Sequence, residues 1–168
     1  IKKINSGKIP FLEENSQKLL KTMTKKKRIY ATNQLRKVIE SKFIIVCIGT
    51  PINNKLNPSL RDFINFFYQL KKFLKKDQII IIRSSIYPGI CNKIYKIIES
   101  KCKNLSYCPE RIVQGKAILE LPKLPQLVSG KNKKAILESS KLFRKVCKKI
   151  IYTKVIEAEL VKLFSNAY

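Results

Sequence analysis

The sequence contains no histidine and no tryptophan, and its five cysteines are scattered without a C-x-x-C pair. Without histidine the chain cannot form the Ser-His or Cys-His pair of a nucleophilic hydrolase. Isolated cysteines also argue against a zinc site, because zinc sites gather cysteine and histidine at short spacings. We therefore predict no metal centre, and we interpret the odd set of separated cysteines as reduced thiols of a cytoplasmic protein.

Glycine is almost as scarce. The five glycines are far apart, so the chain has no G-x-G-x-x-G loop of the kind that cradles a dinucleotide phosphate. Long apolar runs are also missing: the longest purely aliphatic one is Ile79–Ile82, whereas a membrane helix needs roughly 18 apolar residues. The opening residues 1–8 lack the apolar stretch of a signal peptide. We expect no membrane-spanning segment.

Acidic residues are few, 11 against 36 lysines and arginines, which gives a net charge of +25. Such a charge can neutralise the phosphates of a nucleic acid. The lysines, however, are spread over most of the predicted helices, and the abundance of isoleucine, asparagine, tyrosine and phenylalanine is typical of an AT-rich coding sequence. We interpret the charge as solvated lysine faces. A nucleic-acid-binding surface is the alternative, and no motif besides charge favours it.

What the sequence does contain is a regular alternation of strand and helix patterns over the length of one domain. Strands are predicted at residues 28–31, 43–48, 78–85, after Asn104, and at 126–128 and 149–152. Helices are predicted from Pro10 to about residue 25, from Thr32 to about residue 41, after Asn57-Pro58, from Pro88-Gly89, at 135–146 and at 157–168. Alternating strands and helices form βαβ units, so we predict a doubly wound α/β fold with a parallel sheet.

Two patterns mark the core of this fold. The runs at 43–48 and 78–85 are apolar on both faces, as expected of strands buried between two helix layers. The helix after Pro58 carries apolar residues at helical spacing, which predicts one buried face: Leu60, Phe63, Ile64, Phe67, Leu70 and Leu74.

Polar and charged residues follow three of the predicted strands. These strand ends are Gly49-Thr50-Pro51, Ser84-Ser85 and Pro109-Glu110-Arg111. Because parallel strands end at one edge of a sheet, and ligands of such sheets bind at that edge, we predict a ligand site there. Each motif alone is also an ordinary turn, and Glu110 with Arg111 could form a simple strand-end salt bridge.

The last predicted helix adds Lys162 and Asn166, which lie four residues apart and so share one helix face. A lysine held near an acid and an amide can stabilise a developing oxyanion. In a chain so rich in lysine, the competing interpretation is a solvated lysine on an amphipathic helix.

Taken in order, these residues resemble the nucleotide-sugar dehydrogenases, which act on UDP-glucose, UDP-N-acetylmannosamine or GDP-mannose. The resemblance covers essentially the whole chain. The CPERI motif and the Leu-Pro-Gln stretch favour the UDP-N-acetylhexosamine branch. The matching motifs are Asn5-Ser6-Gly7 with Pro10 and Glu13, VCIGTP at 46–51, SSIYPG at 84–89, YCPERI at 107–112, Gly115 with Leu121 and Leu124-Pro125, Gly130, and EAELVKLFSNAY at 157–168.

The resemblance implies NAD-dependent oxidation of the C6 alcohol of a nucleotide sugar to a carboxylate, with two NAD used per turnover. It implies that Thr50, Pro51, Ser85 and Gln114 line the NAD site. Glu110 would be the acid/base that works with water at C6, and Lys162 would stabilise the oxyanion. Asn166 would hold substrate or water, Arg111 would contact the substrate, and Ser85 would also take part in catalysis.

The resemblance also divides the chain into a partial NAD-binding domain, residues 1–153, and the start of a central helical dimerisation domain, residues 154–168. The family's glycine-rich loop and first strand would precede Ile1, and its nucleophilic cysteine would follow Tyr168. We therefore expect a longer protein that forms a homodimer, and an inactive isolated piece. Ser85 stands where the family usually has threonine, and Gln114 stands where many members have glutamate.

Overall fold

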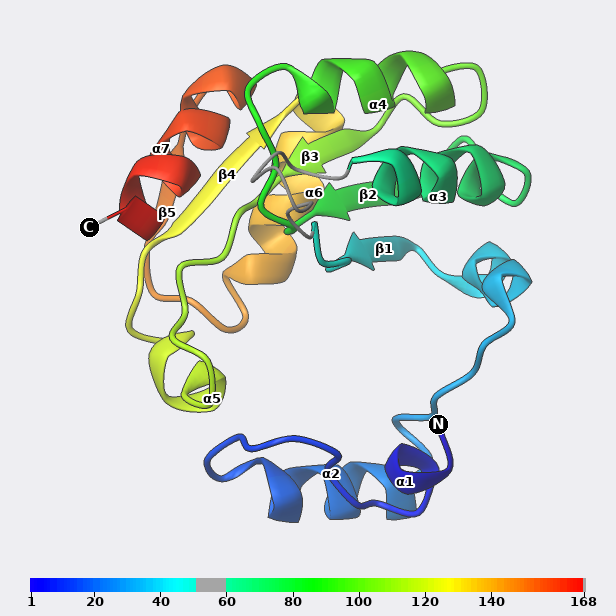
Figure 1. The fold of residues 1–168 in the computed structure, drawn as a ribbon, viewed down its shortest axis with the longest axis vertical. Coiled ribbons are helices and arrows are strands. Elements are labelled where there is room, and N and C mark those ends of the chain that lie inside the picture. Colours follow the sequence, from blue (N-terminus) through cyan, green and yellow to red (C-terminus); the bar gives the residue numbers. More distant parts are fainter. Residues whose placement is uncertain (51–59, 168) are drawn as a thin grey trace.

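The core of the protein is a five-stranded sheet with strand order β1-β2-β3-β4-β5. The computed structural model describes residues 1–50 and 60–167, which are drawn in colour in Figure 1. The strands are β1 (Phe43–Val46), β2 (Ile79–Ile82), β3 (Leu105–Tyr107), β4 (Gln126–Gly130) and β5 (Ile150–Tyr152). The predicted doubly wound α/β fold is confirmed, with one departure in strand direction.

That departure is at β4. Strands β1, β2 and β3 are parallel, but β4 is antiparallel to β3 and parallel to β5. The chain leaves the carboxyl end of β3, forms the short helix α5 (Ala117–Glu120) and re-enters the sheet at the same edge, so β4 runs antiparallel to β3. A parallel strand would need a crossover along the sheet. This return brings Gln126, the first residue of β4, beside the end of β3.

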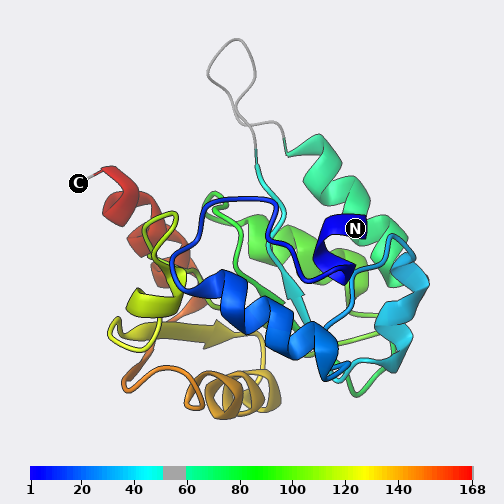
Figure 2. The same ribbon diagram turned by 90° about the horizontal axis from the view of Figure 1, so that it is seen from below.

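Helices cover the sheet on both faces (Figure 2). The helices α3 (Arg61–Lys71) and α4 (Ile90–Ile98) pack on one face with Ile80 and Ile82, whereas Phe143 of α6 (Lys133–Phe143) packs on the other with Ile79 and Ile81. All four residues of β2 are fully buried, as the two-sided apolar run predicted.

The apolar stripe of α3 is confirmed as core. Phe63, Phe67 and Leu70 are at most 1% exposed. The rings of Phe63 and Phe67 meet edge to face, with centroids 5.2 Å apart. The residues Asn57 and Pro58, predicted to start this helix, lie outside the described part of the chain.

The N-terminal third departs most from the sequence prediction. A short helix α1 (Lys2–Asn5) was not predicted, and α2 (Ser16–Lys25) begins six residues after Pro10. The range 28–31 is not a strand, because β1 is the edge of the sheet and this segment runs apart from it (Figure 1). Its backbone pairs instead with a side chain, since Asn5 Nδ2 donates to the Ala31 carbonyl and Asn5 Oδ1 accepts from the Ala31 N–H. The helix predicted from Thr32 is a 3-10 helix, η1 (Leu35–Glu40).

The final helix α7 (Val155–Ala167) begins two residues before the predicted start and packs against β3 and β4. It brings the C-terminal part of the chain back to the carboxyl ends of the parallel strands (Figure 1). The domain boundary after residue 153 stays a prediction. Within the described ranges, no helix is both long and apolar enough to cross a membrane.

Candidate functional site

The structure brings the three predicted strand ends together. Thr50 follows β1, Ser85 follows β2 and Glu110 follows β3, and all three line one cavity of about 230 Å³ with Gly49 and Ser84. The Thr50 hydroxyl donates to the Ser85 carbonyl at 2.7 Å, which links two of the strand ends directly. Pro51, which was also predicted at this edge, lies outside the described residues.

The helix α7 adds a buried ammonium group to this edge. Lys162 Nζ lies 3.5 Å from Glu110 Oε1, and the two side chains are 6% and 35% exposed. The competing interpretation of Lys162 as a solvated lysine is therefore wrong. Burying an ammonium group is costly unless a carboxylate accompanies it, so Glu110 offsets the desolvation cost of Lys162.

The Glu110 carboxylate is held on both of its oxygens. Its Oε2 accepts the Ile112 N–H at 3.0 Å, while Oε1 faces Lys162. Arg111 is not the partner of Glu110, since its Nη2 donates to the Pro125 carbonyl at 2.6 Å. The simple strand-end salt bridge between Glu110 and Arg111 is thus excluded. A fixed, partly exposed carboxylate beside an ammonium can accept a proton while the ammonium stabilises negative charge.

The structure also places at this edge a residue that sequence reasoning missed. Arg83 follows β2 directly, is 9% exposed and lines the same cavity as Ser85 and Glu110. Its Nη1 donates to Gln126 Oε1 at 2.9 Å and to the Cys108 carbonyl at 3.2 Å, and its guanidinium lies 5.0 Å from the centre of the Phe143 ring. A charged residue immediately after four buried isoleucines was the signal that could have identified it.

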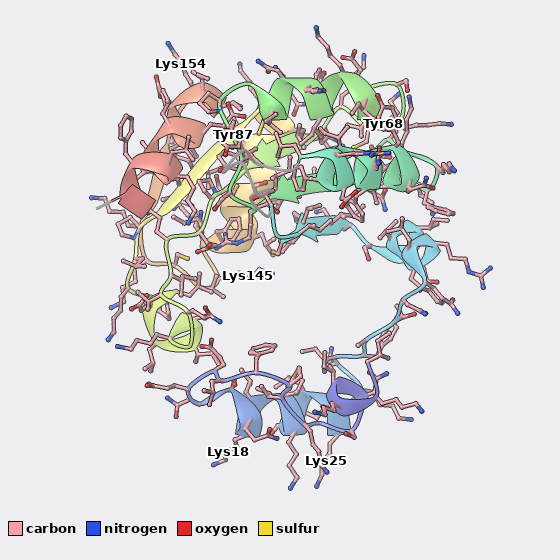
Figure 3. All side chains as sticks on the ribbon, viewed as in Figure 1. Lys18, Lys25, Tyr68, Tyr87, Lys145 and Lys154 are labelled. Atoms are coloured by element: carbon pink, nitrogen blue, oxygen red, sulfur yellow. The ribbon has the colours of Figure 1, made fainter. Side chains whose placement is uncertain are left out.

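Gln114 lies apart from the hydroxyl residues. It is exposed and lines a larger, mainly apolar cavity of about 710 Å³ between the N-terminal segment and the sheet. Glu110 and Arg83 line both this cavity and the smaller one. Lys145, which is labelled in Figure 3, lines the larger cavity. The backbone of Asn166 continues α7, and its side chain lies outside what the structure describes.

One thiol accompanies the site. Cys47 is exposed and lines the cavity with Thr50 and Ser85, whereas the other four cysteines are buried and all five are free. Desolvation at the strand end raises the pKa of the Cys47 thiol, Glu110 adds to the rise, and Arg83 opposes it. Among the described residues, no cluster of histidine, cysteine, aspartate or glutamate could hold a metal ion.

Comparison with known proteins identifies one family. The family model described as "UDP-glucose/GDP-mannose dehydrogenase family, NAD binding domain" matches residues 1–151. The UDP-N-acetyl-D-mannosamine dehydrogenase of Pyrococcus horikoshii is 27% identical over all of this chain and 42% of its own length. That of Methanococcus aeolicus is 32% identical over 77% of this chain and 31% of its own length. The UDP-glucose 6-dehydrogenase of Rickettsia prowazekii is 27% identical over all of this chain and 40% of its own length.

Solved structures agree with this comparison. The structure of the Pyrococcus horikoshii UDP-D-ManNAc dehydrogenase superposes with a TM-score of 0.91 and 26% identity, over 98% of this chain and 41% of that one. A GDP-mannose dehydrogenase from Pseudomonas aeruginosa shares the fold with a TM-score of 0.90 at 22% identity, over 99% of this chain and 41% of that one. The matches thus span 31–42% of the length of these relatives.

Proposed function

Because the chain belongs to the UDP-glucose/GDP-mannose dehydrogenase family and matches the model of that family's NAD-binding domain, we propose that it forms most of the NAD-binding part of a nucleotide-sugar 6-dehydrogenase. The reaction is the oxidation of the C6 alcohol of a nucleotide sugar to the uronic acid. The observation that carries this proposal is the Glu110–Lys162 pair beside the cavity of Thr50 and Ser85. The names of the relatives favour a UDP-sugar, either UDP-glucose or a UDP-N-acetylhexosamine.

The residues of the cavity fit one part of NAD. Neutral hydroxyls and backbone groups, as at Thr50, Ser84 and Ser85, suit the hydroxyl and carboxamide groups of the nicotinamide riboside. A volume of about 230 Å³ holds only part of a dinucleotide. The 168 residues contain no glycine-rich loop for its phosphates.

The geometry supports distinct roles for the two charged residues. NAD, when bound, supplies the acceptor for the hydride that leaves C6. The Glu110 carboxylate, fixed by Ile112, takes the proton of the C6 hydroxyl or of a water. The Lys162 ammonium, buried beside Glu110, stabilises the oxygen that becomes negative. Asn166 lies one helical turn further on α7 and is proposed to hold substrate or water, and Arg111 to contact the substrate.

We expect NAD to protect Cys47 from alkylation in the isolated chain. The thiol lines the proposed nicotinamide cavity and is the exposed one of the five, so a thiol reagent reports on this cavity. Because its pKa is raised, the reaction speeds up as pH increases through the alkaline range. About half of the Cys47 thiol should be protected when the NAD concentration equals the Kd, and nearly all at ten times that concentration.

Pyrophosphate at matched ionic strength is the control for this measurement, because a chain of charge +25 attracts any polyanion. Equal alkylation rates of Cys47 with NAD and with pyrophosphate would show that NAD does not bind in the cavity that Cys47 lines. The rate of alkylation is read by mass spectrometry as the mass that the alkylating reagent adds to Cys47.

We expect the isolated 168-residue chain to produce no NADH from UDP-glucose or UDP-N-acetyl-D-mannosamine. It contains no glycine-rich phosphate loop, and none of its five cysteines matches the family's nucleophile motif. Absorbance at the NADH band, with the Pyrococcus horikoshii relative as positive control, measures this. Steady NADH formation by the isolated chain would contradict the expectation.

The assembly and location of the whole protein are part of the proposal. The exposed face of α7 carries large apolar residues one turn apart, Ile156, Leu160 and Phe164, which supports a homodimer formed through this helix. The five free thiols support a cytoplasmic location of the whole protein.

A nucleic-acid-binding surface receives no support, since the lysines are spread out: Lys18 and Lys154, for example, lie at opposite ends of the molecule (Figure 3). A non-catalytic fragment that pairs with a separate partner is the remaining alternative.

A further inference from the structure

Glu159 is a carboxylate with 1% exposure on α7, one turn before Lys162. Its two oxygens accept backbone N–H groups from a distant part of the chain: Oε2 from Gly89 at 2.8 Å and Oε1 from Cys91 at 2.9 Å. Both donors belong to the start of α4. The first N–H groups of a helix have no partner within it, and α4 has no capping side chain of its own.

These two hydrogen bonds join the elements that carry the site. The chain from Ser84 to Gly89 connects the end of β2 to α4, and Ser85 in this segment lines the cavity. Gly89 has a φ of 92°, so the chain turns sharply where Glu159 holds it. The opposite side of the same segment is held by β3, where the Tyr107 hydroxyl lies 3.4 Å from the Ser84 carbonyl. The segment is therefore fixed between α7 and β3.

A buried carboxylate is retained only where strong donors and a favourable field offset its desolvation. The N-terminus of α4 offers both, through two N–H groups and the positive end of the helix dipole. Because Glu159 and Lys162 lie on the same face of α7, fixing the first also fixes the position of the second relative to Glu110.

We propose that Glu159 is a positioning residue, which ties α7 to the start of α4 and so holds Lys162 against Glu110 and the Ser84–Ser85 strand end in one arrangement. It touches neither substrate nor cofactor. The catalytic consequence rests on the proposed function, whereas the positioning of Lys162 can be measured in the 168-residue chain without any activity.

The test is amine acetylation of the folded chain followed by mass spectrometry. In the unsubstituted chain, Lys162 reacts at least about tenfold more slowly than the exposed Lys154, because its amine is buried. Glu159→Gln keeps the shape but loses the charge and one acceptor, and it raises the Lys162 rate towards that of Lys154. Glu157→Gln, the same change at an exposed position of α7, leaves Lys162 protected. In both variants the buried thiols of Cys102 and Cys108 stay unreactive, which excludes global loosening.

Unchanged protection of Lys162 in Glu159→Gln overturns the proposal. If that variant does not fold, Glu159→Asp takes its place, since it keeps the charge but moves the carboxylate one methylene away from the Gly89 and Cys91 N–H groups. Faster acetylation of Lys162 in Glu159→Asp supports the proposal, and unchanged protection overturns it. Hydrogen exchange of the unsubstituted chain is a second measurement: the Gly89 and Cys91 amides must exchange slowly, and fast exchange at both also overturns the proposal.

Kinetics separate this role from a merely structural one. In an active enzyme that contains this chain, Glu159→Gln lowers kcat by up to about 10²-fold at a temperature where circular dichroism shows the variant to be fully folded. A purely structural role leaves kcat per folded molecule unchanged, and that result overturns the proposal. Should no such enzyme be active, the proposed function fails while the acetylation result still decides on Glu159.

Discussion

Replacing Phe67 by alanine is expected to lower the free energy of unfolding by about 3–5 kcal/mol. Phe67 is 0% exposed, packs between α3 and the sheet, and contacts the Phe63 ring edge to face. The alanine variant loses the transfer free energy of the ring and leaves a cavity that the surrounding isoleucines fill only in part. Since small domains are stable by roughly 5–15 kcal/mol, much of the total stability is lost.

Urea denaturation followed by circular dichroism measures the effect. Tyr68→Ala is the matched control, because Tyr68 is the next residue on α3 and is 54% exposed. We expect this control to change stability by less than about 1 kcal/mol. Equal effects of the two substitutions would show that α3 does not pack as described.

Replacing Lys162 by methionine is expected to lower kcat about 10²–10³-fold in an active enzyme that contains this chain. Such an enzyme can be built from the Pyrococcus horikoshii relative by replacing its corresponding segment with these 168 residues. The folds of the two segments agree closely. Methionine fills similar space without charge, so the variant loses the ammonium group beside Glu110 that we propose stabilises a negative oxygen.

The initial rate of NADH formation measures this loss, and Lys154→Met is the control. Lys154 precedes the same helix, is exposed and points into solvent (Figure 3), so its replacement should leave kcat unchanged. A rise in KM with unchanged kcat in the Lys162 variant would contradict oxyanion stabilisation, because it would indicate uniform binding of substrate and transition state.

The sequence predicted the part of the fold that repeats regular patterns. The apolar run of β2 and the stripe of α3 needed only local periodicity, and both are core. The three strand ends could also be predicted, because parallel strands place their carboxyl ends together whatever lies between them. The antiparallel β4 could not, since the direction of a strand depends on the path of the loop before it rather than on its own residues.

The failures of the sequence prediction have tertiary causes. Residues 28–31 have strand-forming side chains, but a strand exists only with a partner, and here Asn5 occupies the backbone of Ala31. Glu159 looked like an ordinary charged residue, and only the fold shows that it accepts the N–H groups at the start of α4. Arg83 did carry a signal in its place after four isoleucines, but its contact with the cavity depends on the fold. Burial of Lys162 was equally invisible in a chain with 36 basic residues.

The measurement that tests the central claim most directly is NADH formation by the unsubstituted chimera with the Pyrococcus horikoshii relative, assayed with UDP-N-acetyl-D-mannosamine. A parallel chimera that carries the Methanococcus aeolicus segment shows whether the junctions are tolerated. If the edge formed by Thr50, Ser85, Glu110 and Lys162 is a working dehydrogenase site, the chimera forms two NADH for each sugar oxidised. A folded chimera that forms none, beside an active Methanococcus aeolicus control, would contradict it.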